Sequence, residues 1–197
     1  MRILVTGNCT PFIEGGAQSH LQGLQQALQA AGHEVASLLL PFTFSPESSV
    51  TDLMAYTERL DWERPNGQVI DRVISLQFPG YGLRHPHHVA WVMHQHRAVY
   101  DLYDESNASP ALRDLKTQIE AFDRRALSQA RHVFANSGNV AKRLQDHLQM
   151  AATPLYHPPP DAANCYTAEA AGYVYFPSRV ETLKRQDLLL EAARLMK

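Results

Sequence analysis

A cluster of polar side chains follows an apolar run near the middle of this 197-residue chain. Residues 89–93 are apolar, and His94, His96 and Arg97 come directly after them. If the run is a strand of an α/β sheet, the cluster lies beyond its carboxyl end, where such sheets bind ligands. A neutral imidazole there can donate or accept one hydrogen bond, which suits a substrate hydroxyl. We therefore expect these three residues to bind substrate.

The same segment raises the alternative of a metal site, because five histidines lie close together in the sequence: His85, His87, His88, His94 and His96. A metal centre needs convergent ligands and usually a carboxylate or a thiolate. Asp101 is the near candidate for that carboxylate. We favour hydrogen bonding to a substrate and expect no bound metal and no other cofactor.

A second candidate site is the glycine pair Gly15-Gly16, which precedes a helical pattern that begins at Ala17. Glycines at a helix N-terminus let a ligand approach bare backbone N–H groups, and the helix dipole adds partial positive charge. A phosphate or sugar-phosphate oxygen is the expected ligand. The alternative is a tight turn that needs glycine for its backbone angles only.

A third candidate is the pair Arg179 and Lys184, five residues apart in a loop between an expected strand and an expected helix. Such a pair suits a diphosphate, because arginine binds two oxygens at once and lysine supplies a point charge. The alternative is a solvated basic loop.

Alternating strand and helix patterns position these candidates. Apolar, β-branched runs predict strands at residues 2–6, 35–40, 72–76, 89–93, 132–135 and 154–156. Helical spacing predicts helices over residues 17–31, 50–60 and 111–130 and after a cap at Asn136 or Ser137. Residues 42–65 form an excursion outside the sheet. The pattern predicts an α/β fold with a Rossmann-like, doubly wound and mainly parallel sheet.

The end of the chain reads as the start of another domain. We expect an amino-terminal domain over residues 1–157 and a linker over 158–172. Within 173–197 we expect a strand at 173–176, a loop at 178–184 and a helix at 186–195. Those last elements bury too little apolar surface to fold alone. We favour the front part of a longer protein. The alternative is a complete, non-catalytic binding module in which residues 173–197 pack on the first domain.

Composition limits the function classes. A net charge of −2 argues against a broad nucleic-acid surface, so we expect no nucleic-acid partner. The two cysteines have no motif between them, which suggests a reducing, cytoplasmic compartment. No apolar run reaches transmembrane length, so any membrane contact would be peripheral, at the cytoplasmic face.

The first strand also looks like the start of an NAD(P)-dependent dehydrogenase or epimerase. The fingerprint then fails, because Asn8, Thr10 and Pro11 stand where a dinucleotide loop has spaced glycines. No tyrosine is followed four positions later by the lysine that such enzymes use for proton transfer. This function remains the weaker alternative.

Four motifs together resemble family 4 glycosyltransferases of GT-B fold. Residues 15–20 (GGAQSH), with Leu24, Leu28 and residues 32–35, are similar to the amino-terminal signature of that family. Residues 133–144 resemble its late-domain motif, and residues 156–160 its interdomain crossing. Residues 176–184 look like the opening of its second domain, although Ser178 stands where the family usually has glycine.

The resemblance implies a retaining hexosyltransferase that moves a sugar from a nucleotide-sugar donor to a sugar, lipid or polysaccharide acceptor without a metal. By position, Gly15 and Gly16 would approach the phosphates of the donor or the reacting sugar, and His94 would bind a hydroxyl of that sugar. Arg179 and Lys184 would neutralise the leaving diphosphate. Because the family's nucleotide pocket would follow Lys197, we expect the 197-residue chain alone to be inactive.

Overall fold

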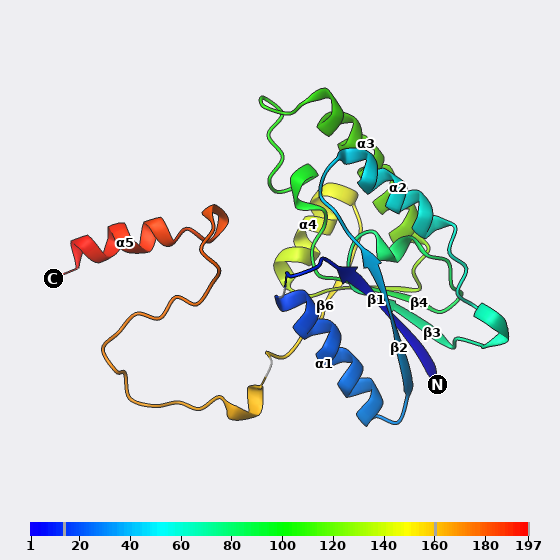
Figure 1. Cartoon of the computed structure of the whole chain (residues 1–197), viewed down its shortest axis with the longest axis horizontal. Helices are drawn as coiled ribbons and strands as arrows, with labels where there is room; N and C mark the ends of the chain where they lie inside the picture. The colour runs from blue at the N-terminus through cyan, green and yellow to red at the C-terminus, as the bar shows by residue number, and fades with distance from the viewer. Residues whose placement is uncertain (14, 160, 197) are drawn as a thin grey trace. The chain divides into compact units, whose positions relative to one another are not determined.

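The strand β1 (Arg2–Cys9) lies inside an open sheet and pairs with a neighbour on each side. A computed structural model describes residues 1–13, 15–159 and 161–196. In that part of the chain six strands, all parallel, run in the order β2-β1-β3-β4-β5-β6 (Figure 1). The other strands are β2 (Glu34–Pro41), β3 (Arg72–Ser75), β4 (His88–Val92), β5 (His132–Ala135) and β6 (Thr153–Pro154). The expected α/β class with a Rossmann-like parallel sheet is confirmed.

Helices cover both faces of this sheet (Figure 1). Neighbouring strand residues point to opposite faces, so Leu4 and Val5 belong to different apolar clusters. On one face, α1 (Gly16–Ala30) packs Leu21 against Val5 and Met93. On the other, helices α2 (Glu47–Glu58), α3 (Pro110–Ser128) and α4 (Gly138–Leu148) enclose the larger cluster, which includes Val50, Ala90, Val92, Ile119, Phe122, Ala135 and Leu144.

The ends of these helices follow from local sequence. Gly32 adopts a φ of 83° after α1, and the His33 N–H donates to the Leu28 carbonyl, as expected for a glycine that ends a helix. The Ser109 hydroxyl accepts from the Leu112 N–H at the start of α3. Of the two expected caps of α4, Ser137 is the N-cap, and its hydroxyl accepts from the Val140 N–H.

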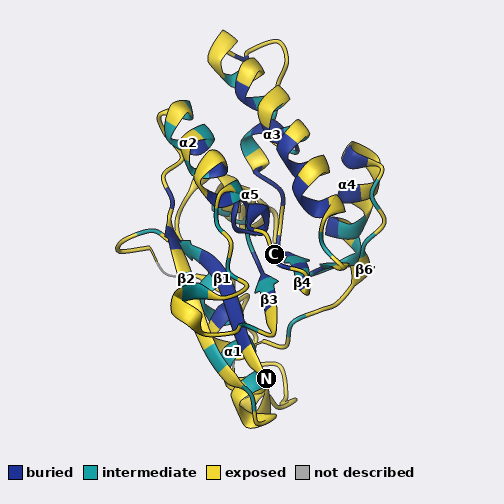
Figure 2. Ribbon diagram, turned by 90° about the vertical axis from the view of Figure 1, so that its right-hand side faces the viewer, coloured by how far each residue is buried: buried dark blue, intermediate teal, exposed yellow. Residues whose placement is uncertain are grey.

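Burial follows the layers (Figure 2). The middle residues of β1 are buried, whereas the helices expose their outer faces. The excursion over residues 42–65 carries α2, whose main neighbours are α3 and the short turn η2 (Gly80–Gly82) rather than a strand. None of the described helices combines the length and the apolar character that a membrane span requires.

The chain divides into two units, Met1–Pro160 and Asp161–Lys197, and this division falls inside the expected linker at 158–172. Residue 160 of that linker and Lys197 lie outside the described residues. The second unit contains α5 (Gln186–Leu195), which has the expected bounds. The strand expected at residues 173–176 does not form, because no described segment pairs with it and an isolated strand leaves its backbone groups unpaired.

Candidate functional site

Backbone hydrogen bonds hold the carboxyl ends of neighbouring strands at one edge of the sheet. Leu76 N–H donates to the Thr6 carbonyl at 3.0 Å, and Met93 N–H donates to the Leu76 carbonyl at 3.1 Å. Further along the edge, Asn136 N–H donates to the Val92 carbonyl at 3.0 Å. The loops that follow β1, β3, β4 and β5 therefore leave the sheet side by side, as the sequence analysis expected for a ligand site.

His94 lies at this edge and is exposed. Its Nδ1 lies 2.8 Å from the Gln95 carbonyl oxygen, which can only accept a hydrogen bond. The Nδ1 atom therefore carries the proton, and in the neutral ring Nε2 is left with a free lone pair. His94 can thus accept a hydrogen bond from a ligand hydroxyl at Nε2.

His96, by contrast, is enclosed by aromatic rings. Its ring centroid lies 6.0 Å from Phe42, 6.2 Å from Phe44 and 5.2 Å from Phe78, and 5% of the residue is exposed. Burial, with a smaller contribution from His94, lowers its pKa to about 4. The ring is neutral near pH 7 and helps to form an apolar wall of the site, whose outermost member is the exposed Phe44.

Arg97 is committed to an intramolecular ion pair. Its Nε donates to Asp101 Oδ2 at 2.9 Å, and Arg143 from α4 approaches the same oxygen at 3.4 Å. Asp101, the nearest carboxylate to the histidines in sequence, is thus held between two guanidinium groups. The negative charge of the Asp101 carboxylate is already compensated by these two cations, so the group is poorly placed to bind a metal.

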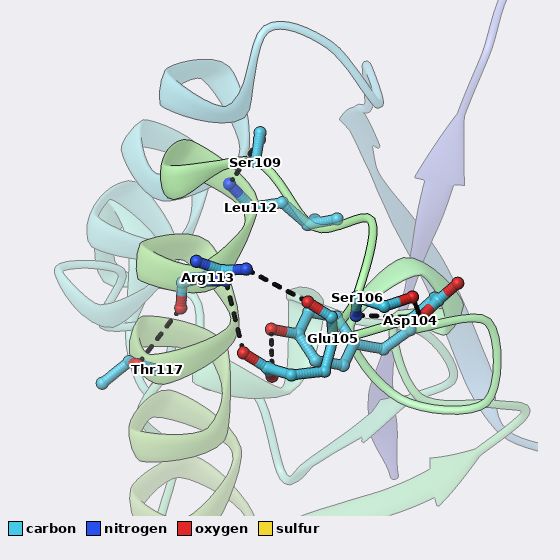
Figure 3. A network of polar contacts seen from close by, with 8 residues as sticks. Asp104, Glu105, Ser106, Ser109, Leu112, Arg113 and Thr117 are labelled. Carbon is cyan, nitrogen blue, oxygen red and sulfur yellow. Dashed lines mark hydrogen bonds and ion pairs between the residues drawn. The ribbon is translucent and has the colours of Figure 1, made fainter.

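The segment after Arg97 is anchored to α3 by a polar network (Figure 3). Arg113 donates to the Glu105 carbonyl at 3.1 Å and pairs with its carboxylate at 3.3 Å. Asp104 Oδ1 accepts from both the backbone and the hydroxyl of Ser106. These contacts fix the path of the chain from the edge of the sheet to the start of α3.

The N-terminus of α1 faces open space. A Cβ atom added at Gly15 or Gly16 would meet no atom within 4 Å, and neither glycine adopts a positive φ between +20° and +160°. The backbone angles therefore do not require glycine, which rules out the tight-turn explanation. Gln18 caps the turn, because its Oε1 accepts from Gly15 N–H at 2.8 Å and its Nε2 donates to the Ile13 carbonyl.

Several buried polar side-chain atoms lack a hydrogen-bond partner. Nine such side-chain atoms occur in the described residues: Thr6 Oγ1, Asn8 Oδ1, His20 Nδ1, His20 Nε2, Trp62 Nε1, Gln95 Nε2, Gln95 Oε1, Asn136 Oδ1 and His157 Nδ1. All except that of Trp62 lie late in β1, early in α1, or just after β4, β5 or β6. Native proteins satisfy most buried polar groups, and Gln95 also approaches the Tyr100 hydroxyl, which bonds Asp123.

The sequence analysis missed His20. It is 3% exposed, and its ring centroid lies 4.3 Å from both Trp91 of β4 and His157 beyond β6. Burial, and secondarily His157, lower its pKa to about 4. The available signal was a histidine in the apolar stripe of α1, next to Leu21. Its partners lie far away in the sequence, so the stripe alone did not reveal the cluster.

Arg179 and Lys184 belong to the second unit and lie in the loop before α5, as expected. Arg179 approaches Glu181 at 3.5 Å, with most of its side chain exposed. Gln186 Nε2 donates to the Arg179 carbonyl at 2.7 Å and ties the loop to the first turn of α5. Both cations remain candidates for a diphosphate.

Comparisons with known proteins assign no family. No protein-family model matches the chain, and no curated protein matches its sequence. Within the described residues, no three His, Cys, Asp or Glu side chains come together as a group that could hold a metal ion.

Proposed function

We propose that the chain is the acceptor-side part of a retaining glycosyltransferase, with the carboxyl edge of the sheet as its active-site wall. One observation supports this most strongly. Polar residues that follow β4 and β5, among them His94 and Asn136, lie at the edge where α/β sheets bind ligands. The motif resemblance to family 4 glycosyltransferases supplies the reaction class, and the edge supplies groups that suit it.

His94 is the proposed contact to the transferred sugar. Its Nε2 lone pair, directed by the bond from Nδ1 to the Gln95 carbonyl, accepts a hydrogen bond from a sugar hydroxyl. A hydrogen bond that strengthens as the sugar becomes electron-poor stabilises the transition state more than the bound substrate.

The leaving group is the second requirement. In the transfer, the anomeric C–O bond to the diphosphate breaks, the acceptor oxygen bonds to that carbon, and the acceptor proton leaves on a phosphate oxygen. In the first unit, the open N-terminus of α1 at Gly15 and Gly16 suits the charge that develops on the diphosphate. In the second unit, the loop with Arg179 and Lys184 is a separate candidate for binding a diphosphate. No metal is needed in this scheme, because these groups supply the positive charge.

The test is release of nucleoside diphosphate by the full-length protein, supplied with UDP- and GDP-activated hexoses and simple glycosides. We expect release that depends on the acceptor, and Gly16→Val should raise the donor KM by roughly tenfold by blocking the helix N-terminus. Gly23→Val in the same helix is the matched control, because it also faces open space. Oxidation or reduction of NAD(P) in place of transfer would overturn the proposal in favour of a dehydrogenase.

A further inference from the structure

A buried carboxyl group on α3 is bonded to the segment that carries His94. Asp123 is 0% exposed, and its two oxygens accept from different tyrosines: Oδ1 from Tyr81 at 2.6 Å and Oδ2 from Tyr100 at 2.7 Å. Tyr81 lies in η2, whereas Tyr100 directly follows the short turn η3 (Arg97–Val99) in the segment that leaves β4. A carboxylate can only accept, so each hydroxyl donates its proton to it. Asp123 therefore ties the segment after β4 to α3.

Gln95 continues this chain of polar contacts toward His94. Burial raises the pKa of Tyr100, whereas the approach of the Gln95 amide lowers it, as an N–H donor to the phenolic oxygen does. Neither amide atom of Gln95 makes a hydrogen bond of ordinary length, although both are buried, so nothing else fixes the direction of this amide. The backbone carbonyl of the same residue accepts from His94 Nδ1 at 2.8 Å. Gln95 thus contacts Tyr100 through its side chain and His94 through its backbone.

The direction of these hydrogen bonds depends on the proton of Asp123. Burial raises the pKa of Asp123 to about 7, although the two tyrosine bonds act in the opposite direction. A proton taken up on Oδ2 makes that oxygen a donor to the Tyr100 oxygen, so the Tyr100 hydroxyl must find another acceptor. Oε1 of Gln95 becomes that acceptor when the amide turns over. Among the described residues the Tyr81 hydroxyl bonds only Asp123, so Oδ2 is the oxygen at which a proton can be accommodated.

Other charges around Asp123 do not duplicate this role. Glu120, one turn earlier on α3, raises the pKa of Asp123 after burial has done so. His147 of α4 lies 5.2 Å from Tyr100 between ring centroids, and the Lys116 ammonium lies 5.8 Å from the same ring. The remaining charged groups on α3 and on the elements packed against it have partners: Lys116 pairs with Glu120, Arg125 with Glu58 of α2, Arg97 with Asp101, and Arg124 donates to the His147 and Leu148 carbonyls. His147 is therefore the group that a test must separate from Asp123.

We propose that Asp123 positions the segment after β4 through Tyr100 and Gln95, and that proton uptake by Asp123 from solvent reverses this chain of hydrogen bonds and turns the Gln95 amide. The segment next to His94 thereby senses the proton state of a group in the core. This inference goes beyond the proposed function and does not depend on it, because every group in the chain belongs to the first unit and no substrate takes part.

An NMR titration of the 197-residue chain from pH 5 to pH 9 tests the inference. It follows the carboxyl carbon of Asp123 and the side-chain amide of Gln95. We expect both signals to change with one common midpoint near pH 7, because a single proton moves both groups. A Gln95 amide that stays constant while Asp123 titrates would overturn the inference, and so would an Asp123 carboxyl group that does not titrate in this range.

Tyr100→Phe removes the link and leaves Tyr81 on Asp123. The Asp123 midpoint should rise, because the ionised form loses a donor, and the Gln95 amide should no longer follow it. Tyr103→Phe is the matched control, since it removes an exposed hydroxyl that bonds Glu105, and it should leave the common midpoint in place.

His147→Asn removes the other titratable group beside Tyr100. The common midpoint of Asp123 and Gln95 should persist in this variant, and its loss would assign the change to His147 and overturn the inference. A Gln95 amide that still follows Asp123 in Tyr100→Phe would also overturn it. The wild-type and His147→Asn measurements decide the question if Tyr100→Phe does not fold.

Discussion

His20 and His157 lie ring on ring, with centroids 4.3 Å apart and an angle of 12° between their planes. One residue comes from the second turn of α1 and the other from the segment beyond β6, so the contact ties opposite ends of the first unit together. Two imidazolium ions could not share this position without strong repulsion in a dry environment. The arrangement therefore requires at least one neutral ring.

This requirement predicts acid destabilisation. Burial lowers the pKa values of His20, His88 and His96 to about 4, below the ordinary value of 6.5. The unfolded chain binds more protons than the folded one between those values, so the stabilisation is complete above pH 6.5 and is lost as pH falls toward 4.

Asp123 opposes this trend. Burial raises its pKa from 3.8 to about 7, so its contribution is present below pH 3.8 and is lost as pH rises through 7. Three histidines outweigh one carboxyl group, so the free energy of unfolding should rise between pH 4 and 6.5. Urea denaturation across that range measures it. His20→Phe should flatten the rise, and an unchanged slope in that variant would contradict the assignment.

The buried carboxyl group also anchors two tyrosines. The Tyr81 hydroxyl donates to Asp123 Oδ1 at 2.6 Å, and the Tyr100 hydroxyl donates to Oδ2 at 2.7 Å. Tyr81→Phe should destabilise the protein by about 1.5–3 kcal/mol, more at pH 8 than at pH 5, because the ionised carboxylate needs the donor more. Tyr103→Phe, which removes a bond to the exposed Glu105, should cost less than about 1 kcal/mol. Equal losses in the two variants would rule out this explanation.

Replacing glycine by alanine should change the stability in opposite directions at two positions, Gly82 and Gly23. A Cβ at Gly82 would lie 2.7 Å from the buried ring of Phe122 and 2.6 Å from Thr57 Oγ1, so Gly82→Ala should destabilise by about 1–3 kcal/mol. Gly23 is an exposed position inside α1 with open space around it, and Gly23→Ala should stabilise by about 0.5–1 kcal/mol. Thermal unfolding of the two variants would test both signs, and a stable Gly82→Ala would show that Phe122 can move.

The strands and helices of the first unit were predictable because each is defined by local spacing. Apolar runs gave all six strands to within a few residues, and the order of elements led to a parallel sheet. The prediction of a strand at residues 173–176 was wrong because a strand also needs a neighbouring strand to pair with, and local sequence does not show whether one is present.

The site was predictable only in outline. The edge holding His94 followed from the strand before it, and Arg97 pairs with Asp101 only four residues away. The enclosure of His96 by Phe78 and the second guanidinium on Asp101, from Arg143, depend on distant segments. His20 escaped detection because Trp91 and His157, which bury it, lie far away in the sequence. The spacing of apolar residues predicts which face of a helix or strand is buried, but not which distant segments will cover it.

The last prediction concerns turnover through His94. If its Nε2 bonds the transferred sugar, His94→Ala in the full-length protein should lower kcat by on the order of ten- to a thousandfold, the range of a lost transition-state hydrogen bond. Donor KM should change much less, because the proposed contact of His94 is to the transferred sugar and not to the diphosphate. Arg179→Ala and Lys184→Ala should show the reverse balance, with a raised donor KM.

His94→Gln is the discriminating companion variant. Glutamine retains an acceptor but loses the Nδ1–H bond that orients the ring on the Gln95 carbonyl, so part of the activity should return relative to alanine. Stability should be unaffected in both variants, because His94 is exposed. Steady-state kinetics beside urea denaturation would separate the two roles. Full turnover in a folded His94→Ala protein would show that the histidine does not contact the reacting sugar.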